Sequence, residues 1–229
     1  MKTVGIIGGF GPETTAQFQL AIIERCRALG SVIRPEILMW NAPIPLRIEE
    51  NLILRSQGIE EFLPFLIHGA KVLEKAGAEF LALPCNSLHV FIEQIRSFVH
   101  IPVFDITNIT VKHLVGKQIK NVAVFGTRTS KNNNLHTKKL EDAGISVILP
   151  TEHEQHAIDQ VILDILNIKA HRRATRILHA IAMDCIQRGA DNMLLACTDL
   201  QIVFPKLKEV RIHDTMHLLA DACVREILR

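Results

Sequence analysis

Two stretches of the chain, GAEFLALPCNSL (77–88) and GADNMLLACTDL (189–200), share one pattern. Each begins with Gly-Ala, continues as an apolar run typical of a buried strand, and then reaches a cysteine followed by polar residues. The Gly-Ala pair, one leucine, the cysteine and the closing leucine recur at a constant spacing. This repeat predicts two copies of a strand that ends near Cys85 or Cys197, each followed by the start of a helix.

Two further pairs of segments occur in the same order around these cysteines. VGIIGG (4–9) is similar to VAVFGT (122–127), and VFDIT (103–107) is similar to IHDTM (212–216), where an aspartate stands in position to cap a helix. We therefore predict two similar domains, related by a pseudo-twofold axis, that exchange their terminal helices. The first would comprise residues 1–104 with 206–229 and carry Cys85, and the second would comprise residues 105–205 and carry Cys197.

Short β-rich runs alternate with amphipathic stretches along the whole chain. Helical spacing of apolar residues covers 60–75, 129–143 and 156–167. Strands are predicted over residues 3–7, 36–40, 80–83, 103–104, 122–125, 146–149, 193–195 and 210–213. This alternation is typical of an α/β protein, so each domain should hold a parallel, mostly four-stranded sheet flanked by helices, with the active site in the cleft between the domains.

Composition, charge and short motifs indicate which partners and cofactors to expect. The 229 residues carry a net charge of +2 without a basic tract, which gives no reason to expect a nucleic-acid or membrane partner. No apolar run is long enough for a signal peptide or a membrane span, so we expect a cytoplasmic protein with reduced cysteines. The five cysteines include no C-x-x-C pair, and the early glycines do not fit G-x-G-x-x-G. We therefore expect neither a metal nor a cofactor.

Cys85 and Cys197 are the candidate catalytic residues, whereas the other three cysteines are expected in the core. Ligands of a parallel sheet bind outside the carboxyl ends of its strands, where both cysteines are predicted to lie. The helix dipole and free N–H groups at that position favour a thiolate, so we expect a lowered thiol pKa. Thiols on opposite walls of one cleft suit the inversion of a carbon acid, because one removes a proton and the other delivers one to the opposite face.

The motifs around these cysteines resemble those of the aspartate/glutamate racemase family, which are cofactor-independent racemases with two catalytic cysteines. PCNSLH (84–89) and ACTD (196–199) are similar to the family's P-C-N-T-x-H and G-C-T-E motifs. GIIGGFGPETTAQF (5–18) resembles its G-G-M-G-P-x-A-T opening, and NAPIPLR (41–47) resembles N-x-P-x-P-D-R. NIKA (167–170) resembles the I-K-x-G stretch of the aspartate racemase branch, so the resemblance runs along nearly the whole chain.

The resemblance implies racemisation of an acidic amino acid, aspartate first and glutamate next, by a thiol/thiolate pair formed by the two cysteines. Asn86 and Thr198 would hold the substrate α-carboxylate, with Thr127 beside it. Arg47 and Lys169 would bind the distal carboxylate, and an arginine can do so through two hydrogen bonds. A homodimer is expected on the same resemblance.

Some positions depart from the family pattern. Ser87 stands where the family has threonine, and Asp199 stands where it has a glutamate that would contact the substrate ammonium. The shorter Asp199 and the missing aspartate before Arg47 leave the identity of the substrate open. His89 could line the cleft or pack beneath it.

Other functions are compatible with the same residues. A non-catalytic binder of small dicarboxylates could use the same two-lobed fold, but it would not need a thiol on each wall. Maleate isomerases, hydantoin racemases and arylmalonate decarboxylases share this fold by resemblance. Arg47, Lys169 and the two cysteine motifs favour the aspartate/glutamate branch among them.

Overall fold

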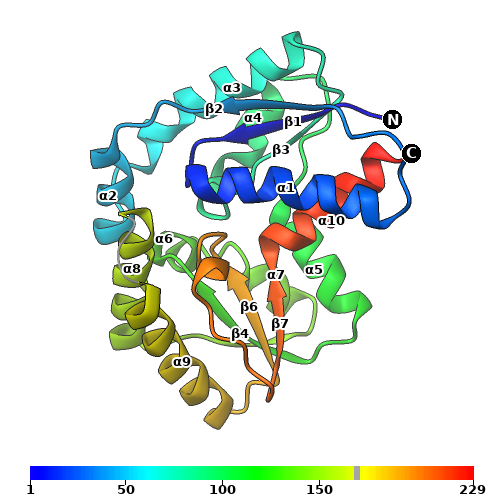
Figure 1. The fold of residues 1–229 in the computed structure, drawn as a ribbon. Helices are drawn as coiled ribbons and strands as arrows, with labels where there is room; N and C mark the ends of the chain where they lie inside the picture. Colours follow the sequence, from blue (N-terminus) through cyan, green and yellow to red (C-terminus); the bar gives the residue numbers. More distant parts are fainter. Residues whose placement is uncertain (168–170) are drawn as a thin grey trace.

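The computed structural model describes residues 1–167 and 171–229, which form two lobes that each surround a parallel sheet (Figure 1). The sheet of the first lobe has the strand order β2-β1-β3, and that of the second lobe has the order β5-β4-β6-β7. Each strand pair within them is parallel, as the alternation of strands and helices predicts. No helix in the described part of the chain has both the length and the apolar character needed to cross a membrane.

The elements follow one another in chain order. Up to residue 97 they are β1 (Val4–Gly8), α1 (Pro12–Ala28), β2 (Ile37–Asn41), α2 (Leu46–Arg55), the 3-10 helix η1 (Ile59–Phe62), α3 (Leu63–Lys75), β3 (Phe80–Ala82), η2 (Ser87–Phe91) and α4 (Ile92–Ser97). Beyond it they are α5 (Ile106–Gly116), β4 (Asn121–Gly126), α6 (Arg128–Asn132), α7 (Thr137–Asp142), β5 (Ser146–Ile148), α8 (Glu152–Leu166), α9 (His171–Gln187), β6 (Asn192–Ala196), η3 (Leu200–Ile202), β7 (Arg211–Asp214) and α10 (Thr215–Ile227).

Strand β1 is buried on both faces, which is why its sequence is apolar throughout. Val4 and Ile6 pack into one core cluster with Phe18 of α1 and Leu219 of α10. Ile7 belongs to a second cluster on the other face, together with residues of α3. Helices thus cover both faces of the first sheet and leave the carboxyl ends of its strands free to carry functional loops.

The crossings between the lobes differ in one respect from the prediction. Strand β7 pairs with β6 in the second sheet, and α10 then packs against α1 in the first lobe. The chain therefore returns to the first lobe at Asp214 rather than near Pro205. Asp105 and Asp214 cap α5 and α10 as predicted, since each carboxylate accepts two backbone N–H groups of the following turn.

Two predicted elements differ in the structure: one helix is divided into two, and one strand is reduced to a bridge. Residues 129–143 form the separate helices α6 and α7, with Asn134 between them in the left-handed conformation at a φ of 51°. Successive asparagines favour such a break because their side chains compete for backbone hydrogen bonds. The predicted strand over 103–104 is reduced to a single parallel bridge between Val103 and Leu81.

Candidate active site

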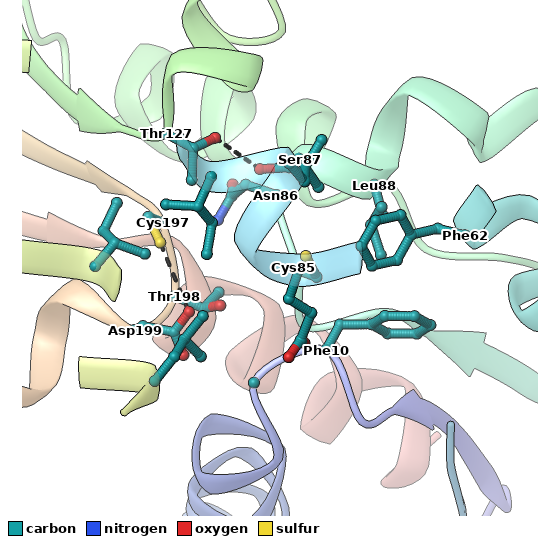
Figure 2. A pocket seen from close by; sticks show the side chains of 16 residues that line it. Phe10, Phe62, Cys85, Asn86, Ser87, Leu88, Thr127, Cys197, Thr198 and Asp199 are labelled. Atoms are coloured by element: carbon teal, nitrogen blue, oxygen red, sulfur yellow. Dashed lines mark hydrogen bonds between the residues drawn. The ribbon is translucent and has the colours of Figure 1, made fainter. Parts of the chain in front are cut away.

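A pocket lies between the lobes, where the carboxyl ends of the two sheets face each other (Figure 2). Its space amounts to about 540 Å³ when the part open to solvent is included. The lining residues are Phe10, Gly11, Glu49, Leu52, Ile53, Phe62, Cys85, Asn86, Ser87, Leu88, Thr127, Ile162, Leu166, Cys197, Thr198 and Asp199. Seven of the nine residues that the sequence predicts for the site therefore line one pocket.

The two cysteines occupy equivalent positions in the two lobes. The Cys85 sulfur accepts hydrogen bonds from the backbone N–H groups of Ser87 and Leu88. The Cys197 sulfur accepts them from Asp199 and Leu200, so both thiols cap the turn that follows them in the same way. Figure 2 shows the two side chains reaching the pocket from different sides.

The prediction of a lowered thiol pKa is wrong. The pKa of Cys85 is raised to about 12, mainly by burial and to a lesser extent by the nearby carboxylates of Asp199 and Glu49, against the backbone N–H groups that lower it. Burial likewise raises the pKa of Cys197 well above its usual value, with Asp199 and Cys85 adding to the effect. The local turn stabilises a thiolate as expected, but desolvation by both lobes outweighs it.

Asn86 is held rigidly beside Cys85. Its side-chain oxygen accepts a hydrogen bond of 2.8 Å from Nε2 of His136, and its amide donates one of 2.9 Å to the Thr215 hydroxyl. Thr215 in turn donates to the carbonyl of Leu195, in the strand that leads to Cys197. Burial lowers the pKa of His136 to about 3, so this histidine is neutral and donates from one nitrogen. The second N–H of the Asn86 amide remains available for a ligand.

Hydroxyl groups line the same part of the pocket. The Ser87 and Thr127 hydroxyls lie 2.7 Å apart, and Thr127 also accepts the N–H of Ser130 as the cap of α6. The Thr198 hydroxyl donates to the carbonyl of Pro84 over 3.0 Å. Together with the Asn86 amide, these groups form a neutral polar wall suited to a carboxylate.

Asp199 is buried next to Cys197. The Cys197 thiol lies 3.8 Å from one of its carboxylate oxygens, and the Thr14 hydroxyl donates to the other. Gly11 makes this approach possible, because a Cβ atom there would lie 2.7 Å from the Asp199 oxygen and its φ of +82° disfavours other residues. Burial raises the pKa of Asp199.

Glu49 is a charged lining residue that the sequence analysis did not predict. Its carboxylate accepts the N–H of Gly11, and burial followed by repulsion from Asp199 raises its pKa to about 7. Glu49 shares one face of α2 with Leu52 and Ile53, which also line the pocket. A carboxylate on the apolar face of an amphipathic helix was the signal that could have identified it.

Two of the residues considered in the sequence analysis lie elsewhere, and a third is not in the part of the chain that the structure describes. The Arg47 side chain is 71% exposed and pairs with Glu61 at 3.7 Å, and it does not line the pocket. Lys169 lies outside the described residues. His89 packs beneath the site, where its Nδ1 donates to the Cys85 carbonyl and its Nε2 accepts the N–H of Ile106. In the described part of the chain, no group of three or more His, Cys, Asp or Glu residues could hold a metal ion.

Comparisons with known proteins agree with this architecture. The chain is 30% identical to the broad specificity amino-acid racemase RacX of Bacillus subtilis, with 98% of each chain covered. Its fold is similar to that of an aspartate racemase homologue from Pyrococcus horikoshii OT3, with a TM-score of 0.80 and 24% identity over the whole of both chains. It is also similar to that of Picrophilus torridus aspartate racemase, with a TM-score of 0.83 and 23% identity over 99% of this chain and 94% of the other.

A family model described as Asp/Glu/Hydantoin racemase matches residues 7–223, which include both cysteine motifs. Because this match spans almost the whole chain and agrees with the curated relative, the protein belongs to the Asp/Glu/hydantoin racemase family.

Proposed function

We propose that this protein racemises a free amino acid, with Cys85 and Cys197 as two bases on opposite faces of the α-carbon. The observation that carries the proposal is the equivalence of the two thiols. Each follows a parallel strand of its own lobe, β3 or β6, caps the next turn through its sulfur, and lines the same pocket. A binding protein needs no such pairing, whereas inversion of a stereocentre does.

The proposed reaction consists of two balanced proton transfers. One cysteine, as the thiolate, removes the α-proton, and the electron pair is delocalised into the substrate carboxylate. The other cysteine, as the thiol, delivers its proton to the opposite face, so the two residues exchange protonation states. The raised thiol pKa values make the thiolate a minor species, and the N–H groups that cap each sulfur favour its formation. The proton transfers need no cofactor.

The polar wall supports a position for the substrate carboxylate. Asn86, Ser87, Thr127 and Thr198 present an amide and three hydroxyls at the ends of strands from both lobes. The free N–H of the Asn86 amide, and the hydroxyl of the Ser87–Thr127 pair that accepts from the other, would donate to the substrate carboxylate and stabilise the negative charge that develops on it after the α-proton leaves. The Thr198 hydroxyl donates its proton to the Pro84 carbonyl instead.

The acidic substrate expected from the sequence remains a prediction. It depended on Arg47 and Lys169, of which Arg47 is exposed and Lys169 lies outside the described residues. The homodimer and the cytoplasmic location also remain predictions.

Exchange of the α-proton tests the proposed function. The purified protein is incubated with single L-amino acids in deuterated buffer, and loss of the α-proton signal and formation of the D-enantiomer are recorded. We expect both for at least one amino acid. Tight binding of amino acids or dicarboxylates without exchange would contradict the racemase and favour a binding protein.

A further inference from the structure

The wall of the pocket away from the polar groups is apolar. Phe10 and Phe62 contact each other with ring centroids 6.0 Å apart, and Figure 2 shows them with Leu88 on the Cys85 side of the pocket. Helix α2 adds Leu52 and Ile53, and helix α8 of the other lobe adds the side chains one turn apart at residues 162 and 166. A substrate side chain that enters this region meets hydrocarbon from both lobes.

The charged side chains among the described residues that line the pocket are all carboxyls. Glu49 and Asp199 both approach Gly11, since Glu49 accepts its N–H and an Asp199 oxygen lies 2.7 Å from where a Cβ atom of residue 11 would be. Among the described lining residues, none is a lysine or an arginine. Arg47, on the same helix as Glu49, instead pairs with Glu61 at the surface. Two neighbouring carboxyls, with no cationic side chain among the described residues that line the pocket, form a site suited to a bound cation.

We propose that the pocket selects amino acids with an uncharged, apolar side chain, and that Glu49 acts with Asp199 as the site for their α-ammonium group. This substrate class rests on the proposed function and deepens it. The polar wall binds the α-carboxylate and the two carboxyls bind the α-ammonium. The aromatic and aliphatic wall contacts the side chain. Leucine and methionine have uncharged, apolar side chains of the kind that this arrangement of the pocket favours.

Acidic side chains fit the pocket poorly for a physical reason. A second carboxylate on the substrate would be desolvated against Phe10, Phe62 and Leu52 and would be repelled by Glu49. A buried carboxylate without a cationic partner is costly. A cationic side chain would likewise lose its hydration against hydrocarbon, because the two carboxyls already hold the α-ammonium.

A panel of amino acids tests the substrate class. Rates of α-proton exchange in deuterated buffer are compared for leucine, methionine, aspartate, glutamate, lysine and arginine. We expect kcat/KM for leucine and methionine to exceed that for aspartate by about a hundredfold or more. Fastest turnover of aspartate or glutamate would overturn the inference and restore the substrate expected from the sequence. Fastest turnover of lysine or arginine would overturn it as well.

Glu49→Gln tests the ammonium site, with Glu50→Gln as its matched control, because Glu50 is the exposed neighbour on the same helix. We expect Glu49→Gln to raise KM for leucine at least about tenfold, with a smaller change in kcat, and Glu50→Gln to change neither. Binding of 4-methylpentanoate, which is leucine without its amino group, should not weaken in Glu49→Gln. Equal weakening of leucine and 4-methylpentanoate would show that Glu49 only supports the fold of the pocket.

Binding measured by calorimetry separates this inference from the proposed function. If no amino acid exchanges its α-proton but leucine still binds more tightly than aspartate, the racemase is wrong and the ligand class holds. If exchange occurs and aspartate binds more tightly, the racemase holds and the ligand class is wrong. If neither amino acid binds, the inference fails.

Discussion

The hydroxyl of Thr198 donates a hydrogen bond of 3.0 Å to the carbonyl of Pro84. Thr198 follows one cysteine of the pocket and Pro84 precedes the other, so this bond joins the two cysteine motifs directly. The relative placement of the thiols therefore depends on a contact between residues that lie far apart in the sequence.

Loss of this bond should impair catalysis. Thr198→Val replaces the hydroxyl by a methyl group and leaves the buried Pro84 carbonyl unpaired, which costs about 1–3 kcal/mol. We expect a lower urea midpoint of unfolding and a fall in kcat/KM of at least about tenfold. Thr198→Ser keeps the hydroxyl and should recover most of kcat/KM. If valine and serine at this position give the same activity, the bond has no part in placing the thiols.

The two cysteines should serve opposite enantiomers. Cys85→Ala and Cys197→Ala should each abolish racemisation, since inversion needs both bases. Each variant keeps one base, which can remove the α-proton of one enantiomer and return a deuteron to the same face. In deuterated buffer, each variant should exchange one enantiomer with retention, and the two should choose different enantiomers. Racemisation by either variant, or exchange of the same enantiomer by both, would exclude the two-thiol mechanism.

The raised pKa of the Cys85 thiol can be measured by alkylation. Because burial raises this pKa to about 12, the rate of reaction with iodoacetamide should climb about tenfold per pH unit from pH 7 to pH 10. Peptide mass spectrometry reports the rate at Cys85 separately from the other cysteines. A rate that levels off near pH 7 would instead indicate the lowered pKa that the helix start alone predicts.

Arg47 should matter little for turnover. Its side chain is exposed and its ion pair with Glu61 lies at the surface, where such pairs contribute about 0–1 kcal/mol. Arg47→Met should therefore leave kcat/KM within about threefold for every substrate in the panel. A selective loss of activity toward aspartate in Arg47→Met would show that this arginine reaches the substrate. Lys169→Met tests the second basic residue by the same measurement.

The two helix caps Asp105 and Asp214 should change the free energy of unfolding in opposite directions as the pH falls. Burial alone would raise the pKa of Asp105, but hydrogen bonds from Thr107 and Asn108 and the charge of Lys139 lower it to about 2. A carboxyl pKa that is depressed in the folded state stabilises the protein above the ordinary value near 3.8, and this contribution is lost as the pH falls toward 2. It amounts to about 2 kcal/mol of the free energy of unfolding.

Asp105→Asn should remove this acid-dependent part of the stability, measured by urea unfolding between pH 4.5 and pH 2.5. Asp214→Asn is the matched control, because burial raises the pKa of Asp214. Protonation of the Asp214 carboxyl is more favourable in the folded than in the unfolded state. This residue therefore adds to the free energy of unfolding as the pH falls. If the free energy of unfolding of Asp105→Asn falls with pH as steeply as that of the original protein, the lowered pKa of Asp105 is wrong.

The sequence by itself determined the two-lobed α/β fold and the pair of thiols. Both follow from local patterns, since a buried strand that ends at a cysteine and a capped turn places that cysteine at the carboxyl edge of a parallel sheet. The same holds for the caps at Asp105 and Asp214. The repeat then indicated that the two edges belong to one site.

The tertiary structure decided which charges face that site. Arg47 and Glu49 lie two positions apart on α2, so they point to different sides of the helix, and packing of α2 against α8 puts Glu49 in the pocket and Arg47 at the surface. The direction of the thiol pKa shifts also depends on both lobes, because desolvation is set by all the side chains that close the pocket. The sequence pattern places Glu49 on the apolar face of α2, but it could not reveal that this carboxyl lies near Cys85 and Asp199, because residues of the two lobes meet only in the folded protein.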